Sequence, residues 1–281
     1  MKDLEVLIGD SLKLLPQLES KSIQCCVTSP PYWGLRDYEH SAQIGSEHSP
    51  IEYVNNLVKV FREVKRILRD NGTLWLNIGD GYARNGGVGK HGPNAIVGNT
   101  KKLIQKRNCK VPHCWGLKDR DLLGIPWRVA FALQEDGWVL RSRITWVKKN
   151  PMPESVKNRP TNATEEIFLF AKSTNYYYNS ESVREASGAN LRNYWILNQE
   201  AGKFGHPAAF PAELARRCIL LGSNEGDVIL DPFGGSGTTG IVANQLHRKA
   251  IIIELNPDYA ATASARGMSI QPQFKSLFAE D

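Results

Sequence analysis

Short apolar runs alternate with longer segments of helical spacing along most of this chain. The short runs predict strands at residues 6–8, 23–28, 73–78, 139–147, 166–171, 228–230 and 250–253. Apolar positions repeating every three or four residues predict helices at residues 11–18, 50–69, 125–134, 211–221, 238–246 and 256–266. Strands that alternate with helices in this way predict an α/β fold built on a doubly wound, mostly parallel sheet.

The helix predicted at residues 50–69 carries its apolar side chains on one face, and Asn71-Gly72 follows it closely. Glycine and asparagine readily adopt the left-handed conformation in which many helices end. We therefore expect this pair to form the C-cap of the helix, with the next strand beginning at Thr73.

The composition of the 281 residues is that of a folded protein, with 41% hydrophobic and 23% charged residues, and it excludes wholesale disorder. No apolar run approaches the roughly 20 residues that a membrane span needs. The first residues show no signal-peptide pattern, so no membrane partner is expected. Five irregularly spaced cysteines argue against a disulfide framework and favour a reducing compartment, which predicts a cytoplasmic location.

The formal net charge of +6 is concentrated in one segment. Residues 82–110 contain seven basic and no acidic residues, so the rest of the chain sums to −1. Seven glycines lie between positions 79 and 98. We interpret residues 81–120 as an inserted, glycine-rich arm that contacts nucleic-acid phosphates, the alternative being a solvated loop. The residues expected to make these contacts are Arg84, Lys90, Lys101, Lys102, Lys106, Arg107 and Lys110.

A glycine-rich turn joins the strand predicted at 228–230 to the helix after it, with glycines at 234, 235 and 237. Glycines let the backbone approach a ligand closely, and the N-terminus of a helix offers free N–H groups. Glu254 closes the next strand, where a carboxylate can accept hydrogen bonds from the hydroxyls of a ribose. The turn matches neither the dinucleotide nor the Walker pattern, so an adenosine-type ligand is favoured over a pyrophosphate.

A second turn, Ser29-Pro30-Pro31-Tyr32, follows the strand predicted at 23–28. The prolines fix φ and hold the residue before each of them extended, so the turn is stiff. Its carbonyls can accept hydrogen bonds from an exocyclic amine, and Tyr32 offers a face on which a flipped base can stack. The alternative is a rigid loop with a packed tyrosine.

Together the two turns resemble the motifs of the amino-directed DNA methyltransferases, in the permuted β-class whose catalytic motif precedes the cofactor motif. Thr28-Ser29-Pro30-Pro31-Tyr32 is similar to the catalytic motif of that family. Residues 231–239 (DPFGGSGTT) are similar to its cofactor motif, and residues 206–211 resemble the segment that contacts the methionine part of the cofactor. The resemblance implies the fold of S-adenosylmethionine-dependent methyltransferases, S-adenosylmethionine as cofactor and double-stranded DNA as substrate.

The resemblance also implies the residues of the site. The catalytic residues implied are Ser29, Pro30, Pro31 and Tyr32. The cofactor-binding residues expected are Asp10, Thr28, His206, Pro207, Asp231, Pro232, Phe233, Gly235, Gly237 and Glu254.

A circular permutation is consistent with the length of chain after Glu254. Only 27 residues follow it, and they predict one helix and a tail. The strand that should come next in such a fold is therefore missing there, and residues 6–10 can supply it. Asp10 would then lie beside Glu254 and could accept from the adenine amino group of the cofactor.

The target is predicted to be an exocyclic amine, whose N–H groups would donate to the Pro30 carbonyl and the Ser29 side chain. No Pro-Cys dipeptide occurs, which argues against C5-cytosine chemistry. In the family, serine at the first motif position is associated with N4 of cytosine, so N4-cytosine is favoured over N6-adenine. Two rival classes are less favoured: an RNA or protein-glutamine methyltransferase, and a non-catalytic nucleic-acid-binding protein that keeps the fold.

We interpret residues 1–281 as one catalytic domain, with residues 182–200 as a second candidate recognition segment beside the arm. A cognate restriction endonuclease and a second copy of the chain are further candidate partners. No metal is expected, because His91, Cys109, His113 and Cys114 are too loosely spaced for a zinc site. Four basic residues around one strand are interpreted as phosphate contacts or as a solvated strand face: Arg141, Arg143, Lys148 and Lys149.

Overall fold

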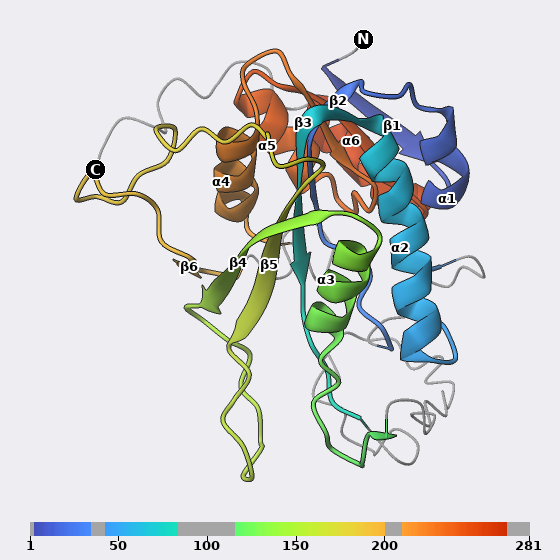
Figure 1. Ribbon diagram of the computed structural model, residues 1–281, viewed down its shortest axis with the longest axis vertical. Helices are drawn as coiled ribbons and strands as arrows, with labels where there is room; N and C mark the ends of the chain where they lie inside the picture. Colours follow the sequence, from blue (N-terminus) through green and yellow to red (C-terminus); the bar gives the residue numbers. More distant parts are fainter. Residues whose placement is uncertain (1–2, 35–42, 84–115, 200–209, 269–281) are drawn as a thin grey trace.

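The computed structural model describes residues 3–34, 43–83, 116–199 and 210–268, and their core is a single mixed sheet (Figure 1). Within these residues, five of the seven strand pairs are parallel. The strand order is β1-β8-β7-β2-β3-β5-β4-β6. The strands are β1 (Leu4–Ile8), β2 (Ile23–Thr28), β3 (Leu68–Ile78), β4 (Val139–Lys148), β5 (Thr164–Ala171), β6 (Tyr194–Leu197), β7 (Val228–Asp231) and β8 (Lys249–Glu254). The predicted α/β fold with a mostly parallel sheet is confirmed.

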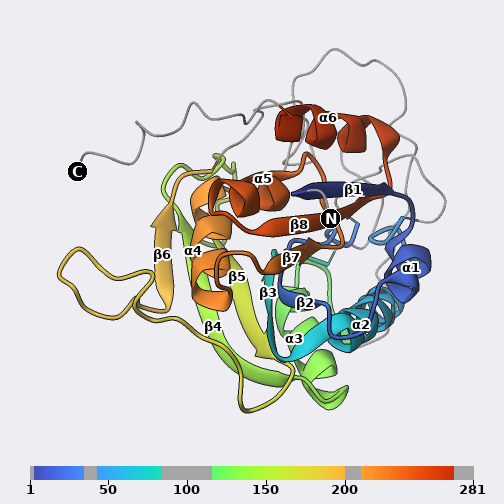
Figure 2. The same ribbon diagram turned by 90° about the horizontal axis from the view of Figure 1, so that it is seen from above.

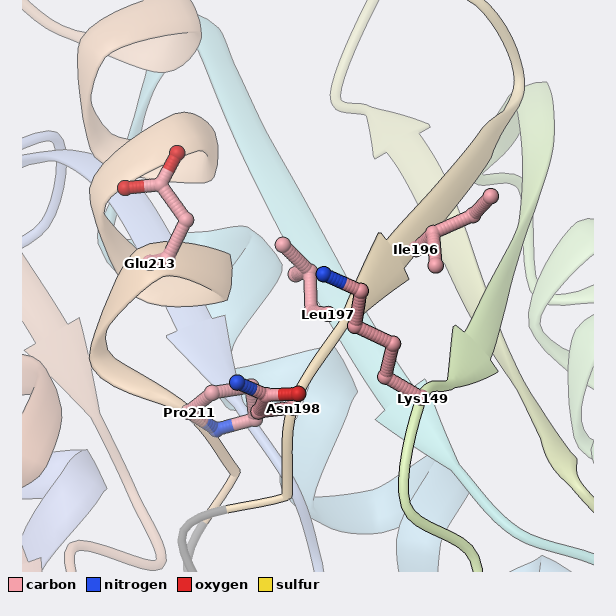
Figure 3. Close-up of a pocket in the computed structure, with 6 residues that line it drawn as sticks. All are labelled: Lys149, Ile196, Leu197, Asn198, Pro211 and Glu213. Carbon is pink, nitrogen blue, oxygen red and sulfur yellow. The ribbon is translucent and has the colours of Figure 1, made fainter. Parts of the chain in front are cut away.

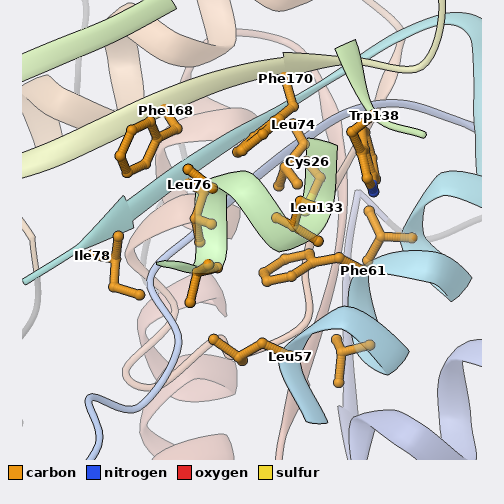
Figure 4. Packing of buried hydrophobic residues seen from close by; sticks show 14 of the residues in the cluster. Cys26, Leu57, Phe61, Leu74, Leu76, Ile78, Leu133, Trp138, Phe168 and Phe170 are labelled. Carbon is orange, nitrogen blue, oxygen red and sulfur yellow. The ribbon is translucent and has the colours of Figure 1, made fainter. Parts of the chain in front are cut away.

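Helices cover both faces of this sheet (Figure 2). On one face, α2 and α3 pack over a core that includes Phe61, Leu133 and Phe168 (Figure 4). On the other face, α4 and α5 pack over a second core that includes Trp75 and Trp195. The helices are α1 (Ser11–Leu14), followed by a 3-10 turn (Leu15–Gln17), α2 (Pro50–Ile67), α3 (Ile125–Glu135), α4 (Ala212–Gly222), α5 (Thr238–Gln245) and α6 (Pro257–Met268).

The first strand of the chain completes the sheet beside the last one. β1 pairs in parallel with β8, from Leu4 opposite Ala250 to Ile8 opposite Glu254. The Gly9 N–H donates to the Glu254 carbonyl at 2.9 Å, so Asp10 begins directly beside Glu254. The N-terminal strand therefore takes the place that the permutation assigned to it.

The direction in which successive strands are added to the sheet reverses between the parallel neighbours β7 and β2. From β7 the chain continues outward to β8, whereas from β2 it continues to β3 on the opposite side. In sheets of this kind, ligands bind outside the carboxyl ends of the strands at such a switch point. The two turns predicted to carry function follow β7 and β2, which are neighbours. The topology alone therefore brings them together.

The boundary between α2 and β3 differs from the prediction. The helix ends at Ile67 and β3 begins at Leu68, so Asn71 and Gly72 lie within the strand and not in a C-cap. The ladder between β2 and β3 is irregular here, because Ile23 pairs with Leu68 but Cys25 pairs with Thr73. The turn signal therefore marks a bulge, where extra residues of one strand are accommodated.

Two predicted segments take part in the fold. Of the segment 182–200, residues Tyr194–Leu197 form the edge strand β6, which pairs in parallel with β4. Residues 81–83 and 116–123 hold the two ends of the predicted arm together, since the Ala83 N–H donates to Asp121 and the Arg120 N–H donates to Ala83, both at 2.8 Å. Among the described residues, no helix is long and apolar enough to cross a membrane.

Candidate active site

The glycine-rich turn after β7 is held against the end of β8. The Gly234 N–H donates to the Ile253 carbonyl at 2.9 Å, and the Gly235 N–H donates to Glu254 Oε2 at 2.7 Å. Gly237 has a φ of +84° and precedes α5 directly. Burial raises the pKa of the Glu254 carboxyl, although the backbone N–H groups of Asn256 and Gly235 oppose the rise. The turn therefore presents backbone and a carboxylate at the carboxyl edge of the sheet.

Asp10 and Glu254 end neighbouring strands, as predicted, but both carboxylates already have backbone partners. Asp10 Oδ1 accepts from the Leu12 N–H at 2.9 Å and caps α1. Glu254 Oε1 accepts from the Asn256 N–H at 2.8 Å. A carboxylate has two oxygens with two lone pairs each, so both groups can accept further hydrogen bonds.

Asp231 ties the two turns together from beneath. It is only 2% exposed, and it accepts from Thr28 Oγ1 at 2.6 Å and from Thr239 Oγ1 at 2.7 Å. The Phe233 N–H also donates to it, at 3.0 Å. Thr28 is buried too, with 1% of its surface exposed. Both side chains thus hold the two turns in register, and the assignment of Thr28 and Asp231 as cofactor-binding residues stays a prediction.

Asp231 gives the stability of the fold a distinctive pH dependence. Burial raises the pKa of its carboxyl from the ordinary 3.8 to about 6. Because the folded pKa is the higher one, the folded state binds the proton more tightly. This carboxyl therefore destabilises the fold above pH 6, and the penalty fades as the pH falls towards 4. We expect Asp231→Asn, which cannot titrate, to remove a pH-dependent term of roughly 3 kcal/mol between pH 4 and 7.

Urea unfolding of both proteins across this pH range measures the term. As the pH is lowered from 7 to 4, the free energy of unfolding of the wild type should increase relative to that of Asp231→Asn. Two pH profiles that run parallel would contradict the ionisation assigned to Asp231.

The Ser-Pro-Pro-Tyr turn lies beside the end of β3. Tyr53 Oη on α2 donates to the Pro31 carbonyl at 2.9 Å and holds the turn from one side. Among the described residues, no group donates to the Pro30 carbonyl. A side chain at Gly79 would meet the Tyr32 ring, since its Cβ would lie 2.6 Å from Cε2. Gly79 therefore lets the Tyr32 ring lie directly against the backbone.

A polar network that the sequence did not predict surrounds the Tyr32 hydroxyl. Tyr32 Oη donates to Glu165 Oε2 at 2.5 Å. Asn77 Nδ2 donates to Tyr32 Oη at 3.0 Å and to Glu165 Oε2 at 2.9 Å. Lys148 Nζ pairs with Glu165 Oε1 at 2.6 Å. The one signal in the sequence was Asn77, a polar residue in the otherwise apolar end of a buried strand.

Lys148 was interpreted as a phosphate contact or part of a solvated face, and the structure shows neither. Its side chain is 14% exposed and forms the ion pair with Glu165. Arg143 pairs with Glu166 on the next position of β5. Two of the four basic residues of this strand region are thus engaged by carboxylates.

An open cavity of about 260 Å³ lies at the same edge of the sheet, between the end of β6 and the start of α4 (Figure 3). Its lining is mixed in polarity: Lys149, Ile196, Leu197, Asn198, Pro211 and Glu213. None of these residues is among the predicted catalytic or cofactor-binding residues, but Ile196–Asn198 lie in the predicted recognition segment 182–200, and Pro211 ends the segment 206–211. The predicted site residues His206 and Pro207, and all seven basic residues of the arm, lie outside the described residues. So do the cysteine and histidine residues weighed as a zinc site, and within the described part no group of three candidate ligands could hold a metal.

Residues 23–265 match the family model described as DNA methylase, N6_N4_Mtase. That span runs from the start of β2 to α6 and includes both turns. The chain belongs to this DNA methylase family. The resemblance drawn from the two motifs is confirmed.

Two curated relatives align with nearly the whole methylase. Type II methyltransferase M.Cfr9I of Citrobacter freundii is 50% identical over 262 residues, which cover 92% of this chain and 85% of that protein. Type II methyltransferase M.SmaI of Serratia marcescens is 44% identical over 272 residues, covering 95% and 91%.

Solved structures share the fold of the methylase. The PvuII DNA methyltransferase (cytosine-N4-specific) superposes with a TM-score of 0.71 at 24% identity, over 94% of this chain and 86% of that one. A putative DNA modification methylase from Thermus thermophilus, complexed with S-adenosyl-L-methionine, has a TM-score of 0.65 at 26% identity, over 96% and 95%. The predicted methyltransferase fold is thereby confirmed.

Proposed function

We propose that this DNA methylase transfers the methyl group of S-adenosylmethionine to N4 of a cytosine that is flipped out of double-stranded DNA. The observation that carries the proposal is the union of two turns at the switch point of the sheet. Ser29–Tyr32 follows β2, and residues 232–237 follow β7 beside it. Asp231 accepts a hydrogen bond from Thr28 Oγ1, which links the cofactor turn to the catalytic turn.

The residues present fit the adenosine part of this cofactor. Gly235 and Gly237 leave backbone as the surface of the turn, and a Cβ at Gly237 would lie 2.8 Å from Ala263 Cβ. Glu254 can accept from ribose hydroxyls and Asp10 from the adenine amino group, with lone pairs that their backbone partners leave free. Arg266 braces the turn from α6 by donating to the Ser236 carbonyl and hydroxyl. When bound, S-adenosylmethionine supplies a sulfonium methyl group that a nucleophile can displace.

The residues of the catalytic turn make a poor nucleophile more reactive. The lone pair of an exocyclic amine is delocalised into the base. Hydrogen bonds from its N–H groups to Ser29 Oγ and the Pro30 carbonyl favour a tetrahedral nitrogen, whose lone pair is available. The bound cofactor would supply its methyl group to this nitrogen with loss of the carbon–sulfur bond, and the nitrogen would release one proton to solvent. Positioning and electrostatics supply the acceleration, and no covalent enzyme intermediate is needed.

The choice of N4-cytosine over N6-adenine rests on Ser29 at the first position of the catalytic motif. The test is to methylate DNA with the purified protein, digest it to nucleosides and analyse these by mass spectrometry. N4-methylcytosine is the expected product, and N6-methyladenine would overturn the finer assignment while keeping the DNA methylase. RNA of the same sequence and an acceptor protein serve as competing substrates, and methylation of either one in place of DNA would overturn the choice of substrate.

We further propose that the basic residues of the arm, residues 81–120, contact the DNA backbone. The proposal is supported by the bonds that hold the two ends of the arm together shortly after β3, the strand whose end carries Asn77. Residues 182–200 are proposed as a second recognition segment, of which Tyr194–Leu197 form strand β6 of the sheet. We also propose that the chain forms a single catalytic domain and acts in the cytoplasm. Its proposed protein partners are a cognate restriction endonuclease and a second copy of the chain.

A further inference from the structure

Glu165 occupies a position at the edge of the sheet that no motif marks. It lies on β5 opposite Trp146, and the pairing of Ile78 with Glu166 brings it level with the end of β3. Successive residues of a strand point to opposite faces, so Glu165, Ile167 and its partner Asn77 share one face. The Glu165 side chain is 13% exposed. A carboxylate buried to this degree is costly unless its oxygens are occupied.

The donors around Glu165 fix the direction of a hydrogen-bond chain. Ionised Glu165 can only accept, so the hydrogen of Tyr32 Oη must point to it across the 2.5 Å contact. Tyr32 Oη is then left as an acceptor, and Ser29 Oγ donates to it at 3.3 Å. The chain therefore runs from Ser29 through Tyr32 to Glu165.

Asn77 reinforces this direction. Its Nδ2 faces three oxygens and lies 3.4 Å from Ser29 Oγ, in addition to its contacts with Tyr32 and Glu165. The opposite orientation of the amide would place Oδ1 against the Glu165 carboxylate, which cannot donate. Ser29 Oγ thus directs its hydrogen towards Tyr32 and retains a lone pair for another donor.

We infer that Glu165 is a positioning residue for the methyl transfer, and that it acts through Tyr32. By accepting from the phenol it orients the hydroxyl groups of Tyr32 and Ser29, so that Ser29 Oγ offers a lone pair to the target amine. It also holds the Tyr32 ring in place against Gly79. The inference rests on the proposed function, since it concerns the target amine whose N–H group donates to Ser29 Oγ.

Two features keep these hydrogen bonds directed from Ser29 through Tyr32 to Glu165. Lys148 Nζ lies 2.6 Å from Glu165 Oε1, so this oxygen is engaged by the ion pair and Oε2 is left to accept from Tyr32. Burial and the charge of Glu165 raise the pKa of the Tyr32 phenol well above its ordinary value, so Tyr32 stays protonated and donates. Charged partners strengthen hydrogen bonds of this kind.

A double-mutant cycle tests the inference. Glu165→Gln keeps the volume, but its amide cannot accept from Tyr32 and Lys148 at once. In the wild-type background, we expect it to lower the single-turnover rate constant by about 10- to 100-fold, the range that a misplaced reacting group can cost. In a Tyr32→Phe background the same substitution should change the rate constant by less than about twofold, because the hydrogen bond from the phenol, through which Glu165 is inferred to act, is already removed. Affinities for S-adenosylmethionine and DNA should stay constant throughout.

Glu166→Gln is the matched control, because it removes a carboxylate from the opposite face of the same strand and should leave the rate unchanged. An unchanged rate for Glu165→Gln, or an equal loss in the Tyr32→Phe background, would overturn the inference. If Glu165→Gln unfolds at the assay temperature, Tyr32→Phe alone decides: it keeps the ring and breaks the chain, so a wild-type rate would overturn the inference. A wild-type protein that methylates no DNA amine would instead refute the proposed function.

Discussion

Ser29→Ala is expected to reduce methyl transfer by about 100-fold, the usual cost of removing one hydrogen-bonding group from a preorganised reaction site. The variant loses the oxygen that accepts from the target amine and the start of the chain to Tyr32. Cofactor affinity should stay within about twofold of the wild type, because the residues of the cofactor turn do not contact the Ser29 hydroxyl. Transfer of a labelled methyl group to DNA under single-turnover conditions measures the first effect, and titration calorimetry measures the second.

Ser22→Ala provides the control for Ser29→Ala. Ser22 lies just before β2, at the opposite edge of the sheet, and its hydroxyl donates only to the nearby Glu19 carbonyl. It should retain full activity. If the Ser29→Ala protein transfers methyl groups within threefold of the wild-type rate, the Ser29 hydroxyl has no catalytic role.

The second large effect is expected for Gly237→Ala, which should abolish measurable cofactor binding and lower stability by about 2 kcal/mol. Two costs combine at this position. Gly237 has a left-handed φ of +84°, which is unfavourable for any residue with a Cβ. The added Cβ would also lie 2.8 Å from Ala263 Cβ on α6. Relief requires α6 or the turn to move, and either movement disturbs the cradle between Gly235 and Glu254.

Gly226→Ala separates the two costs. Gly226 has a nearly identical φ of +81°, but no atom lies within 4 Å of the position that an added Cβ would take. It should lose only the conformational part, about 1 kcal/mol, and should bind S-adenosylmethionine normally. Thermal melts and calorimetry of both variants make the comparison. Equal behaviour of the two would show that the contact with α6 is unimportant.

Much of the cofactor and catalytic frame could be predicted from the sequence because it depends on local patterns. Each turn follows a short apolar strand, and carboxyl ends of parallel strands meet at one edge, so the motifs imply their own proximity. The position of β1 followed from counting the residues after Glu254. Both inferences use the order of elements along the chain and need no knowledge of side-chain contacts.

Glu165 could not be predicted in the same way, because its role depends on register. In the sequence it is one of two adjacent glutamates at the start of a strand, Glu165 and Glu166. Only the antiparallel pairing of β5 with β3 shows that Glu165 shares a face with Asn77, while Glu166 points away. A slip of one residue would exchange them.

Thr28 and Asp231 illustrate a second limit of motif reading. A motif identifies residues that matter for a site, but it does not tell whether a side chain faces the ligand or the interior. Both side chains are buried, and their hydrogen bond joins two residues that are 203 positions apart in the chain. Burial of this kind depends on how helices cover the sheet, which local sequence patterns do not describe.

The pairing of β1 with β8 has a consequence for how the protein is made. Residues 4–8 are synthesised long before their partner strand, which spans residues 249–254. Until then β1 has no β8 to pair with, and the cradle for the cofactor lacks Glu254. Contacts of such long range slow folding and expose strand edges to aggregation in the meantime. The cradle for the cofactor is therefore complete only after residues 249–254 have been translated and have paired with β1.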